Sequence, residues 1–464
     1  MSKETDARQP LHASISRRRF LRGLAVGTAA LSASVLAACG ASAPATPAAP
    51  GEAPAQAPAQ PSGEPAKIRS LMWSTGPVLD ENFKKRAEMF NAAHAGRYEV
   101  DLQILPWDQY WPKVDLGYAS KQPFDVYAWD VQAYGHYKAG LVRNIQEDVN
   151  MVAGLTDKDQ YPLDLMDVWR FDGTNLYALP DNIQMLALYY NKDLFDKAGL
   201  SYPDETWTWD NMLEAARKMT IVEGDTPTQW GMDVGDLTAW WGTQTLAWAM
   251  GGSFFDKIVE PTKFTVSEPA TVQAIKFIQD LMFTEKIAPD GVQRQAAAQD
   301  VNIFLTGKVG MYPGGTWFIS SCKDAAFKWD IAPMPKWQDK RALAFWFGGW
   351  VVAKDSKHPE AATAFATWSA TEYQQTLAET KDWIPIRRDA RESAKMQEGM
   401  PSGFQSVMKT LPDARLGDLY HRNSQQIISE VLFPTFDLVW NNKLTPEEAA
   451  KQIDEKANEL LNKA

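Results

Sequence analysis

Tryptophan stands out among the residue types in this chain that are able to bind a ligand. The 464 residues include 19 tryptophans, against 14 tyrosines and 20 phenylalanines. An indole ring is large and carries an N–H that needs a partner, so a core alone rarely requires so many. Such a surplus is typical of a groove where flat ligand faces stack on aromatic rings. A plain excess of core tryptophans is the alternative.

Two of these tryptophans lie where predicted strands end, each beside a polar residue. Trp73 and Ser74 close a strand predicted over residues 68–73, and Trp129 and Asp130 close one predicted over residues 125–129. Open α/β sheets bind ligands beyond the carboxyl ends of their strands, so these four side chains are candidate ligand contacts. The alternative for Asp130 is a cap on the following helix.

Two more tryptophans follow glycine pairs. Trp317 comes shortly after Gly315, and Trp350 comes directly after Gly349. Glycine allows a ligand to approach the backbone closely, which makes Gly349 itself a candidate. For both tryptophans a core position is the alternative.

Patterns that would indicate a metal, a cofactor or a nucleophile are absent from the sequence. It has 2 cysteines and 5 histidines, without a CxxC or HExxH spacing. It also lacks a GxSxG elbow, a P-loop and a dinucleotide fingerprint. We therefore expect no cofactor, no metal and no catalysis. A secreted carbohydrate-active enzyme remains the alternative, because a glycosidase needs only two carboxylates about 5–9.5 Å apart.

The elements that must position these residues alternate between strand and helix. Strand patterns cover residues 68–73, 100–104, 125–129 and 185–190. Helical patterns cover residues 192–198, 208–219, 269–283, 359–369 and 446–461, with Ser267 as the expected cap of the third. Asp172 and Gly173 indicate a turn between strands at 168–171 and 176–179. This alternation over nearly 400 residues predicts an α/β architecture.

Four stretches resemble the extracellular solute-binding proteins of ABC sugar importers, the family that includes maltodextrin-binding proteins. They occur in order and together extend over most of the chain after residue 67. The stretches are ALP at 178–180 with LYYNKDLF at 188–195, AGL at 198–200 and TWTWD at 206–210; GKVGM at 307–311 with GGTW at 314–317; GGWVV at 348–352 with SKHPEAA at 356–362; and IPIR at 384–387 with TPEEAA at 445–450.

This resemblance implies two lobes joined by hinge strands, the type II periplasmic-binding-protein-like fold, with a solute held between them. The N-terminal lobe would comprise residues 67–181 plus 349–385, and the C-terminal lobe residues 182–348 plus 386–464. A chain of this length is also too long for one ordinary hydrophobic core. Closure around the solute would follow a hinge mechanism.

The resemblance also implies particular ligand contacts. Trp317 and Trp241 match aromatic positions that stack on sugar, and Arg387 matches a position that reaches the ligand in some relatives. Gln184 falls where related proteins place a carboxylate, and Asn182 lies beside it on the same crossover. The neutral Gln184 is a departure that favours a solute other than maltodextrin. A sugar, from mono- to oligosaccharide, fits such a mixture of aromatic and polar groups, although glycerol phosphate is among the alternatives.

The first 66 residues are predicted to contain an export signal followed by a tether. Residues 16–22, SRRRFLR, match the twin-arginine export pattern, in which Arg17 and Arg18 form the pair. The uncharged segment 23–38 would rise only about 24 Å as a helix, short of a roughly 30 Å hydrocarbon core. Residues 1–38 are therefore predicted to be a signal peptide, and Cys39, in a lipobox-like LAAC, a lipidated residue. Residues 39–66, rich in alanine and proline, form the predicted tether.

The partners expected from these features are a small solute, the transmembrane subunits of an ABC permease and the membrane through a lipid anchor. A net charge of −11 without a basic stripe argues against nucleic acid. We expect a monomer outside the cytoplasm, anchored to the bacterial cell membrane in the periplasm or at the cell surface. An envelope sensor that uses the same cleft is a further alternative.

Overall fold

The computed structural model describes residues 64–162, 167–224, 226–298 and 301–463. They belong to the compact unit Gln60–Ala464. The predicted export signal with Arg17 and Arg18, the lipidation residue Cys39 and nearly all of the tether lie outside the described residues. Within them, no helix is both long and apolar enough to cross a lipid bilayer.

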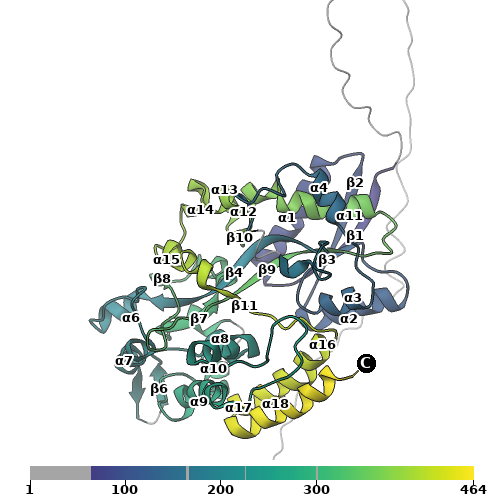
Figure 1. Cartoon of the computed structure of the whole chain (residues 1–464). Coiled ribbons are helices and arrows are strands. Elements are labelled where there is room, and N and C mark those ends of the chain that lie inside the picture. The colour runs from purple at the N-terminus through teal and green to yellow at the C-terminus, as the bar shows by residue number, and fades with distance from the viewer. Residues whose placement is uncertain (1–63, 163–166, 225, 299–300, 464) are drawn as a thin grey trace, which may run out of the picture. The chain divides into compact units, whose positions relative to one another are not determined.

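A mixed sheet forms the centre of this unit (Figure 1). Strands β1 (Ala66–Trp73), β2 (Tyr98–Leu105) and β3 (Val126–Ala128) run parallel, with β1 between the other two. Strand β9 (Ala344–Val352) pairs antiparallel with β3. The carboxyl ends of β1, β2 and β3 therefore share one edge of the sheet.

Strand β4 (Leu179–Asn191) belongs to two parts of the sheet, and all of its residues are buried. Its first half pairs with β9 and with β10 (Ile384–Pro385). Its second half pairs with β7 (Met311–Gly315) and β8 (Trp329–Ala332). The register of the β4–β9 pair shifts between Pro180 and Asn182. A short strand, β11 (Arg415–Leu416), pairs parallel with β9.

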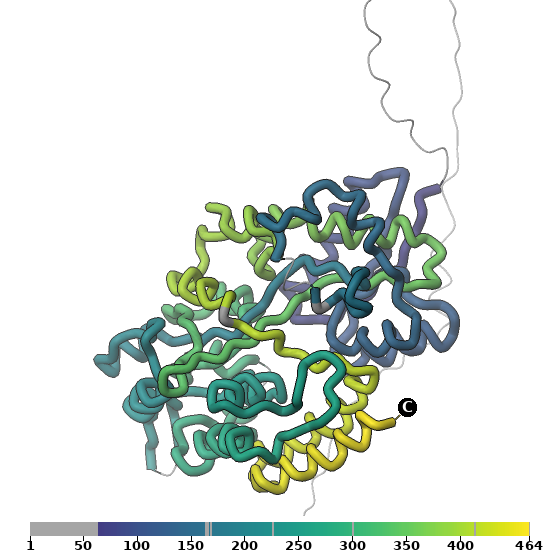
Figure 2. The backbone as a smooth tube through the Cα atoms, viewed as in Figure 1, coloured from purple at the N-terminus to yellow at the C-terminus, as the bar shows by residue number. Residues whose placement is uncertain are grey.

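Helices from distant parts of the chain pack around the first three strands. Helices α1 (Pro77–Ala93), α2 (Trp107–Ala119) and α3 (Ala133–Lys138) come from the same region of sequence. Helix α11 (Pro359–Ala370) contacts β1, β2, β3, β4 and β9, and Figure 2 shows its green segment among the purple and blue ones. The chain thus returns to its beginning after nearly 300 residues.

A second group of helices packs mainly on one another, and its helix α8 (Trp240–Met250) also contacts β9. Helix α8 packs on α9 (Pro269–Phe283), which contacts the C-terminal α18 (Pro446–Leu461). Helix α17 (Phe433–Trp440) also packs on α18 and follows a π-helix at Ile427–Leu432. The remaining α-helices are α4 (Gln146–Met151), α6 (Lys192–Lys197), α7 (Trp209–Met219), α10 (Gly291–Ala298), α12 (Tyr373–Thr380), α13 (Arg388–Arg391), α14 (Ala394–Gln397), α15 (Phe404–Met408) and α16 (Ser424–Gln426); β5 (Ile221–Glu223) and β6 (Thr226–Gln229) form a separate pair.

The predicted helices and strands are confirmed within one or two residues in most cases, with helices 269–283 and 446–461 at the predicted bounds. Thr445 begins α18 with a capping box, in which its hydroxyl accepts the Glu448 N–H at 3.2 Å. The predicted cap Ser267 is wrong: Glu268 occupies that position, and the Ser267 N–H donates to Asp454 at 2.9 Å.

The predicted strand pair around Asp172 and Gly173 is also wrong. A 3-10 helix covers Asp167–Trp169, and β4 begins only at Leu179. The Asp172 carboxylate accepts the N–H groups of Thr174 and Asn175 at 2.9 and 2.7 Å. A turn therefore forms as expected, but its bonds are local and no strand pairing accompanies it.

Candidate functional site

A cavity of about 350 Å³ is lined by residues from the early strands, from the crossing strands and from the helices around β7. Eight of its nineteen lining residues are tryptophans: Trp73, Trp107, Trp129, Trp240, Trp241, Trp317, Trp346 and Trp383. The polar lining residues are Thr75, Asp130, Gln132, Asn182, Gln184 and Asp418. Seven residues predicted from the sequence meet here: Trp73, Trp129, Asp130, Asn182, Gln184, Trp241 and Trp317.

One wall is built from the shared edge of β1, β2 and β3. Trp73 is the last residue of β1, Trp107 begins the helix after β2, and Trp129 follows β3. Trp73 and Trp107 meet edge to face with their centroids 5.2 Å apart, a favourable arrangement for aromatic rings. Trp107 is 39% exposed, so it lies at the rim of the cavity.

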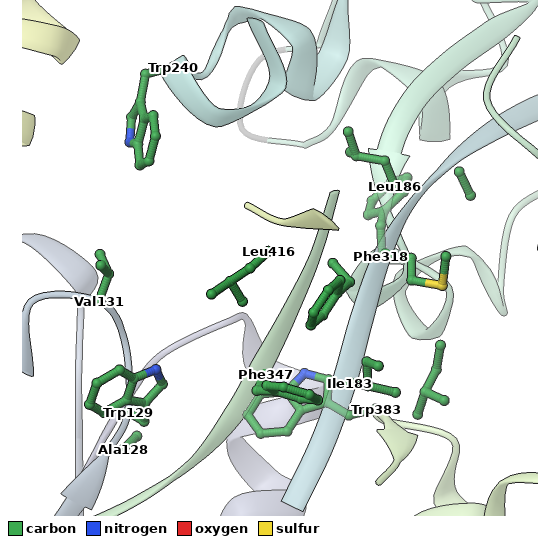
Figure 3. Close-up of a cluster of buried hydrophobic side chains, with 14 of the residues drawn as sticks. Ala128, Trp129, Val131, Ile183, Leu186, Trp240, Phe318, Phe347, Trp383 and Leu416 are labelled. Atoms are coloured by element: carbon green, nitrogen blue, oxygen red, sulfur yellow. The ribbon is translucent and has the colours of Figure 1, made fainter. Parts of the chain in front are cut away.

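The wall on the other side is a triangle of three indole rings. The centroids of Trp241 and Trp346 lie 5.0 Å apart, and Trp317 lies 5.6 Å from each of them, all edge to face. Close packing requires glycine next to two of these rings. A Cβ at Gly315 would lie 2.2 Å from the Trp317 ring, and one at Gly417 would lie 2.4 Å from the Trp346 ring. Figure 3 shows three more lining residues: Trp240 of α8, Phe347 of β9 and Trp129, which follows β3.

Two carboxyl groups face the cavity from different parts of the chain. Asp130 follows β3, and Asp418 lies just beyond β11. Desolvation raises the pKa of Asp130 to about 6, although its Oδ1 accepts the Val131 N–H. Burial, and then the charge of Asp130, raise the pKa of Asp418 well above its usual range. The hydroxyl of Tyr420 and the indole of Trp346 hydrogen-bond the Asp418 carboxylate.

The amides on the crossover are bonded within the wall. Asn182 Nδ2 donates to Asp181 Oδ1 at 2.6 Å, and Gln184 Nε2 donates to Asn182 Oδ1 at 3.1 Å. The Thr316 hydroxyl donates to Gln184 Oε1 at 2.7 Å. These bonds connect β4 to Thr316, the first residue of the 3-10 helix Thr316–Phe318 that contains Trp317, so the amides have a fixed orientation in the cavity wall.

Trp350 lies in the core and not on the cavity, which corrects the expectation that it contacts ligand. Its side chain is 2% exposed, and its indole N–H donates to Asp181 Oδ2 at 2.9 Å. The same oxygen accepts Arg86 Nη1 at 2.6 Å, and both charged side chains are fully buried. A buried ion pair requires hydrogen bonds to its remaining lone pairs and protons, and the Trp350 N–H provides one of these to Asp181.

Three other candidates also lie off the cavity. Gly349 acts through its backbone: its carbonyl accepts the Trp129 N–H at 2.8 Å, and a Cβ there would lie 2.2 Å from the Leu179 oxygen. The Ser74 hydroxyl donates to Asp80 at 2.6 Å. Arg387 pairs with Asp389 at 2.5 Å, and both side chains are partly exposed at the surface.

Twelve of the nineteen lining residues were not predicted from the sequence, and Trp107, Trp346, Trp383 and Asp418 are the most informative of them. Trp107 follows β2 just as Trp129 follows β3, so the strand-end rule identifies it once β2 is extended to Leu105. Trp383 directly precedes the motif at residues 384–387, and Trp346 precedes the glycine pair at 348–349. Asp418 carries no local signal, because its position depends on the pairing of β11 with β9.

A second cavity, of about 410 Å³, lies within residues 233–312. It is lined by Asp233, Asp236 and Arg294, and Arg294 pairs with Asp233 at 2.8 Å. Tyr312 is its one aromatic lining residue among those described. The tryptophan-lined cavity is therefore the candidate site for a stacking ligand. Among the described residues, no group of three or more His, Cys, Asp or Glu side chains is arranged to hold a metal ion.

The family model of the bacterial extracellular solute-binding proteins matches residues 73–376. The maltodextrin-binding protein of Bacillus subtilis is 28% identical over 233 residues, which are 48% of this chain and 53% of that protein. The arabinooligosaccharide-binding protein of Halalkalibacterium halodurans is 25% identical over 298 residues, 60% of this chain and 64% of that protein. The matched region thus spans between half and two thirds of these relatives.

A solved ABC substrate-binding protein from Listeria monocytogenes, in complex with cycloalternan, has the same fold. It superposes with a TM-score of 0.76 at 23% identity, over 86% of this chain and 100% of that one. The two-lobed α/β class predicted from the sequence is thereby confirmed. The chain belongs to the bacterial extracellular solute-binding proteins, a family of binding proteins and not of enzymes.

Proposed function

We propose that this protein captures a carbohydrate outside the cytoplasm and delivers it to an ABC importer. The observation that carries this proposal is the cavity in which eight tryptophans and two carboxyl groups converge. Sugar rings present flat C–H faces to indole planes and hydroxyl groups to carboxylates and amides. The relatives that bind maltodextrin and arabinooligosaccharide support the same class of ligand.

The lobes are residues 67–181 plus 349–385 and residues 182–348 plus 386–464. Strands β4 and β9 cross this boundary at residues 181–182 and 348–349, where they pair with each other. Trp73, Trp129 and Trp383 come from the first lobe, and Trp241 and Trp317 from the second. A solute bound between these groups contacts both lobes and so favours their closed arrangement.

We infer from membership of a family of binding proteins that the cavity holds its solute without cleaving it. A general acid and a base or nucleophile must reach opposite sides of one glycosidic bond. Asp418 is instead engaged by Tyr420 and Trp346, and its pKa is well above that of a nucleophilic carboxylate. Incubation with oligosaccharides should release no shorter product, and turnover by the wild type that Asp418→Asn abolishes would refute this point.

Outside the described residues, we propose export through Arg17 and Arg18 and lipidation at Cys39, with residues 39–66 as a tether. The lipid would hold a monomeric protein beside the permease. Cys39→Ser should move the protein from the membrane fraction to the soluble extracytoplasmic fraction. Continued membrane association of this variant would contradict lipid anchoring.

The sugar assignment is tested by calorimetry and thermal unfolding with a panel of mono- and oligosaccharides. A ligand at one hundred times its Kd should stabilise the protein by about 2.7 kcal/mol. Trp317→Ala should weaken binding by about 1–3 kcal/mol, because it removes one ring of the triangle. Trp337→Ala is the matched control, since Trp337 packs on Phe277 away from the cavity. A panel that stabilises nothing would refute carbohydrate capture.

A further inference from the structure

We propose that the solute carries a positive charge: a protonated amine on a hydroxylated, sugar-like body. The inference rests on the proposed function, because it takes the tryptophan-lined cavity as the site of the solute. It follows from the charges, the acceptor groups and the aromatic faces of that cavity.

The charges on the cavity wall are all of one sign. Asp130 and Asp418 are its acidic residues, and none of the nineteen described lining residues is Lys, Arg or His. Arg86 is a cation behind the wall, with its Cζ 5.9 Å from the centroid of the Trp383 ring. Its charge is already matched by Asp181 at 2.6 Å. An anionic solute such as a phosphate ester would therefore find no cationic partner among the described lining residues.

The strongest polar groups on the wall accept hydrogen bonds. The Gln132 side-chain oxygen is buried and has no hydrogen-bond partner. Asp130 accepts a hydrogen bond from the Val131 backbone, which leaves its second oxygen without a donor among the described residues. Asn182 and Gln184 each donate within the wall. An ammonium group has three donors and no acceptor, so it complements such a set.

The tryptophan rings are the third feature of the cavity, after its charges and its hydrogen-bond acceptors, that favours a cationic solute. A cation over the face of an indole ring is attracted by the ring quadrupole, most strongly where water is excluded. The eight indoles and the two carboxyl groups line the same cavity. Trp346 links the indole rings to the carboxyl groups, because its ring belongs to the triangle and its N–H donates a hydrogen bond to Asp418.

The carboxyl pair lacks a counter-charge until such a ligand arrives. The titratable groups that face it, Tyr110 beside Asp130 and Tyr420 beside Asp418, are neutral at physiological pH. Burial and mutual repulsion therefore favour the protonated carboxyls, and the pKa of Asp130 is about 6. A bound cation favours their ionised form. Affinity for a cationic solute should consequently rise between pH 5 and pH 6.5, while that for a neutral analogue changes little.

The test compares three disaccharides of one shape by calorimetry at pH 6.5: the glucosamine disaccharide with free amines, its N-acetylated form and cellobiose. Choline serves as a cation that is not a sugar. The variant Asp130→Asn removes one carboxylate from the cavity. Asp339→Asn is the matched control for net charge, since Asp339 is exposed and does not line the cavity.

We expect the amine form to bind at least tenfold more tightly than both neutral forms, with this preference lost in Asp130→Asn and kept in Asp339→Asn. Equal or tighter binding of a neutral sugar would overturn the charge inference and leave carbohydrate capture standing. Binding of choline alone would support a cationic solute and refute carbohydrate capture. Absence of binding by all four compounds would count against the charge inference, and the wider sugar panel then decides carbohydrate capture separately.

Discussion

Replacing Asp181 with asparagine tests how the crossing of β4 and β9 is held together. Asp181 Oδ2 accepts Arg86 Nη1 at 2.6 Å and the Trp350 indole N–H at 2.9 Å, while Oδ1 accepts Asn182 Nδ2 at 2.6 Å. An asparagine amide must place its NH₂ on one of these two sides. Either orientation puts a donor against a donor, and both leave the Arg86 charge without its partner.

The size of the effect follows from burial. Arg86 and Asp181 are 2% and 0% exposed, and removing one partner of such a pair costs about 3–5 kcal/mol. Unfolding entropy near 2.1 cal/mol/K per residue amounts to about 0.8 kcal/mol/K for a body of roughly 400 residues. Asp181→Asn should therefore lower Tm by about 4–6 °C.

Differential scanning calorimetry and urea unfolding of the purified protein measure this loss. The double variant Arg86→Met/Asp181→Leu is the control, because replacing both charges by apolar groups leaves no buried ion without a partner. It should be less destabilised than Asp181→Asn. A loss below about 1 kcal/mol for Asp181→Asn, or a double variant that is worse than the single one, would refute the reasoning.

Three further predictions concern the two cavities. Gly417→Ala places a Cβ 2.4 Å from the Trp346 ring, so we expect ligand affinity by calorimetry to fall at least tenfold; unchanged affinity would show that the ring moves freely. Trp107→Ala, at the exposed rim, should weaken binding by about 1 kcal/mol and leave Tm within about 2 °C; a larger fall in Tm would make Trp107 a core residue. Burial raises the pKa of Asp236 to about 7, so the folded protein retains a proton that the unfolded chain releases from about pH 4 upward. The wild type should thus lose stability relative to Asp236→Asn as pH rises from 4 to 7 in urea unfolding, and parallel curves would contradict this.

The parts of the site that could be predicted are those with local signals. Trp73 and Trp129 end short apolar strands, and parallel strands end at one edge, so sequence and general sheet geometry placed both. Trp241 and Trp317 were predicted from the family resemblance and lie on the same cavity. The helices with clear caps and periodic apolar faces were also predicted closely.

The rest depended on contacts between distant residues. Trp350 follows two glycines and looked like a ligand residue, but it packs on a pair whose members lie 264 and 169 residues earlier in the chain. Asp418 reaches the cavity only because β11 pairs with β9. Near Asp172 the sequence correctly predicted a turn, but the two strands predicted on either side of that turn do not pair.

The triangle of Trp241, Trp317 and Trp346 has a spectroscopic consequence. Indole rings with centroids 5.0–5.6 Å apart and nearly perpendicular planes are close enough for their electronic transitions to couple. Such coupling yields a paired circular-dichroism band whose sign and amplitude depend on ring geometry. A solute that enters among these rings would change that band, so occupancy could be read optically without attaching a dye.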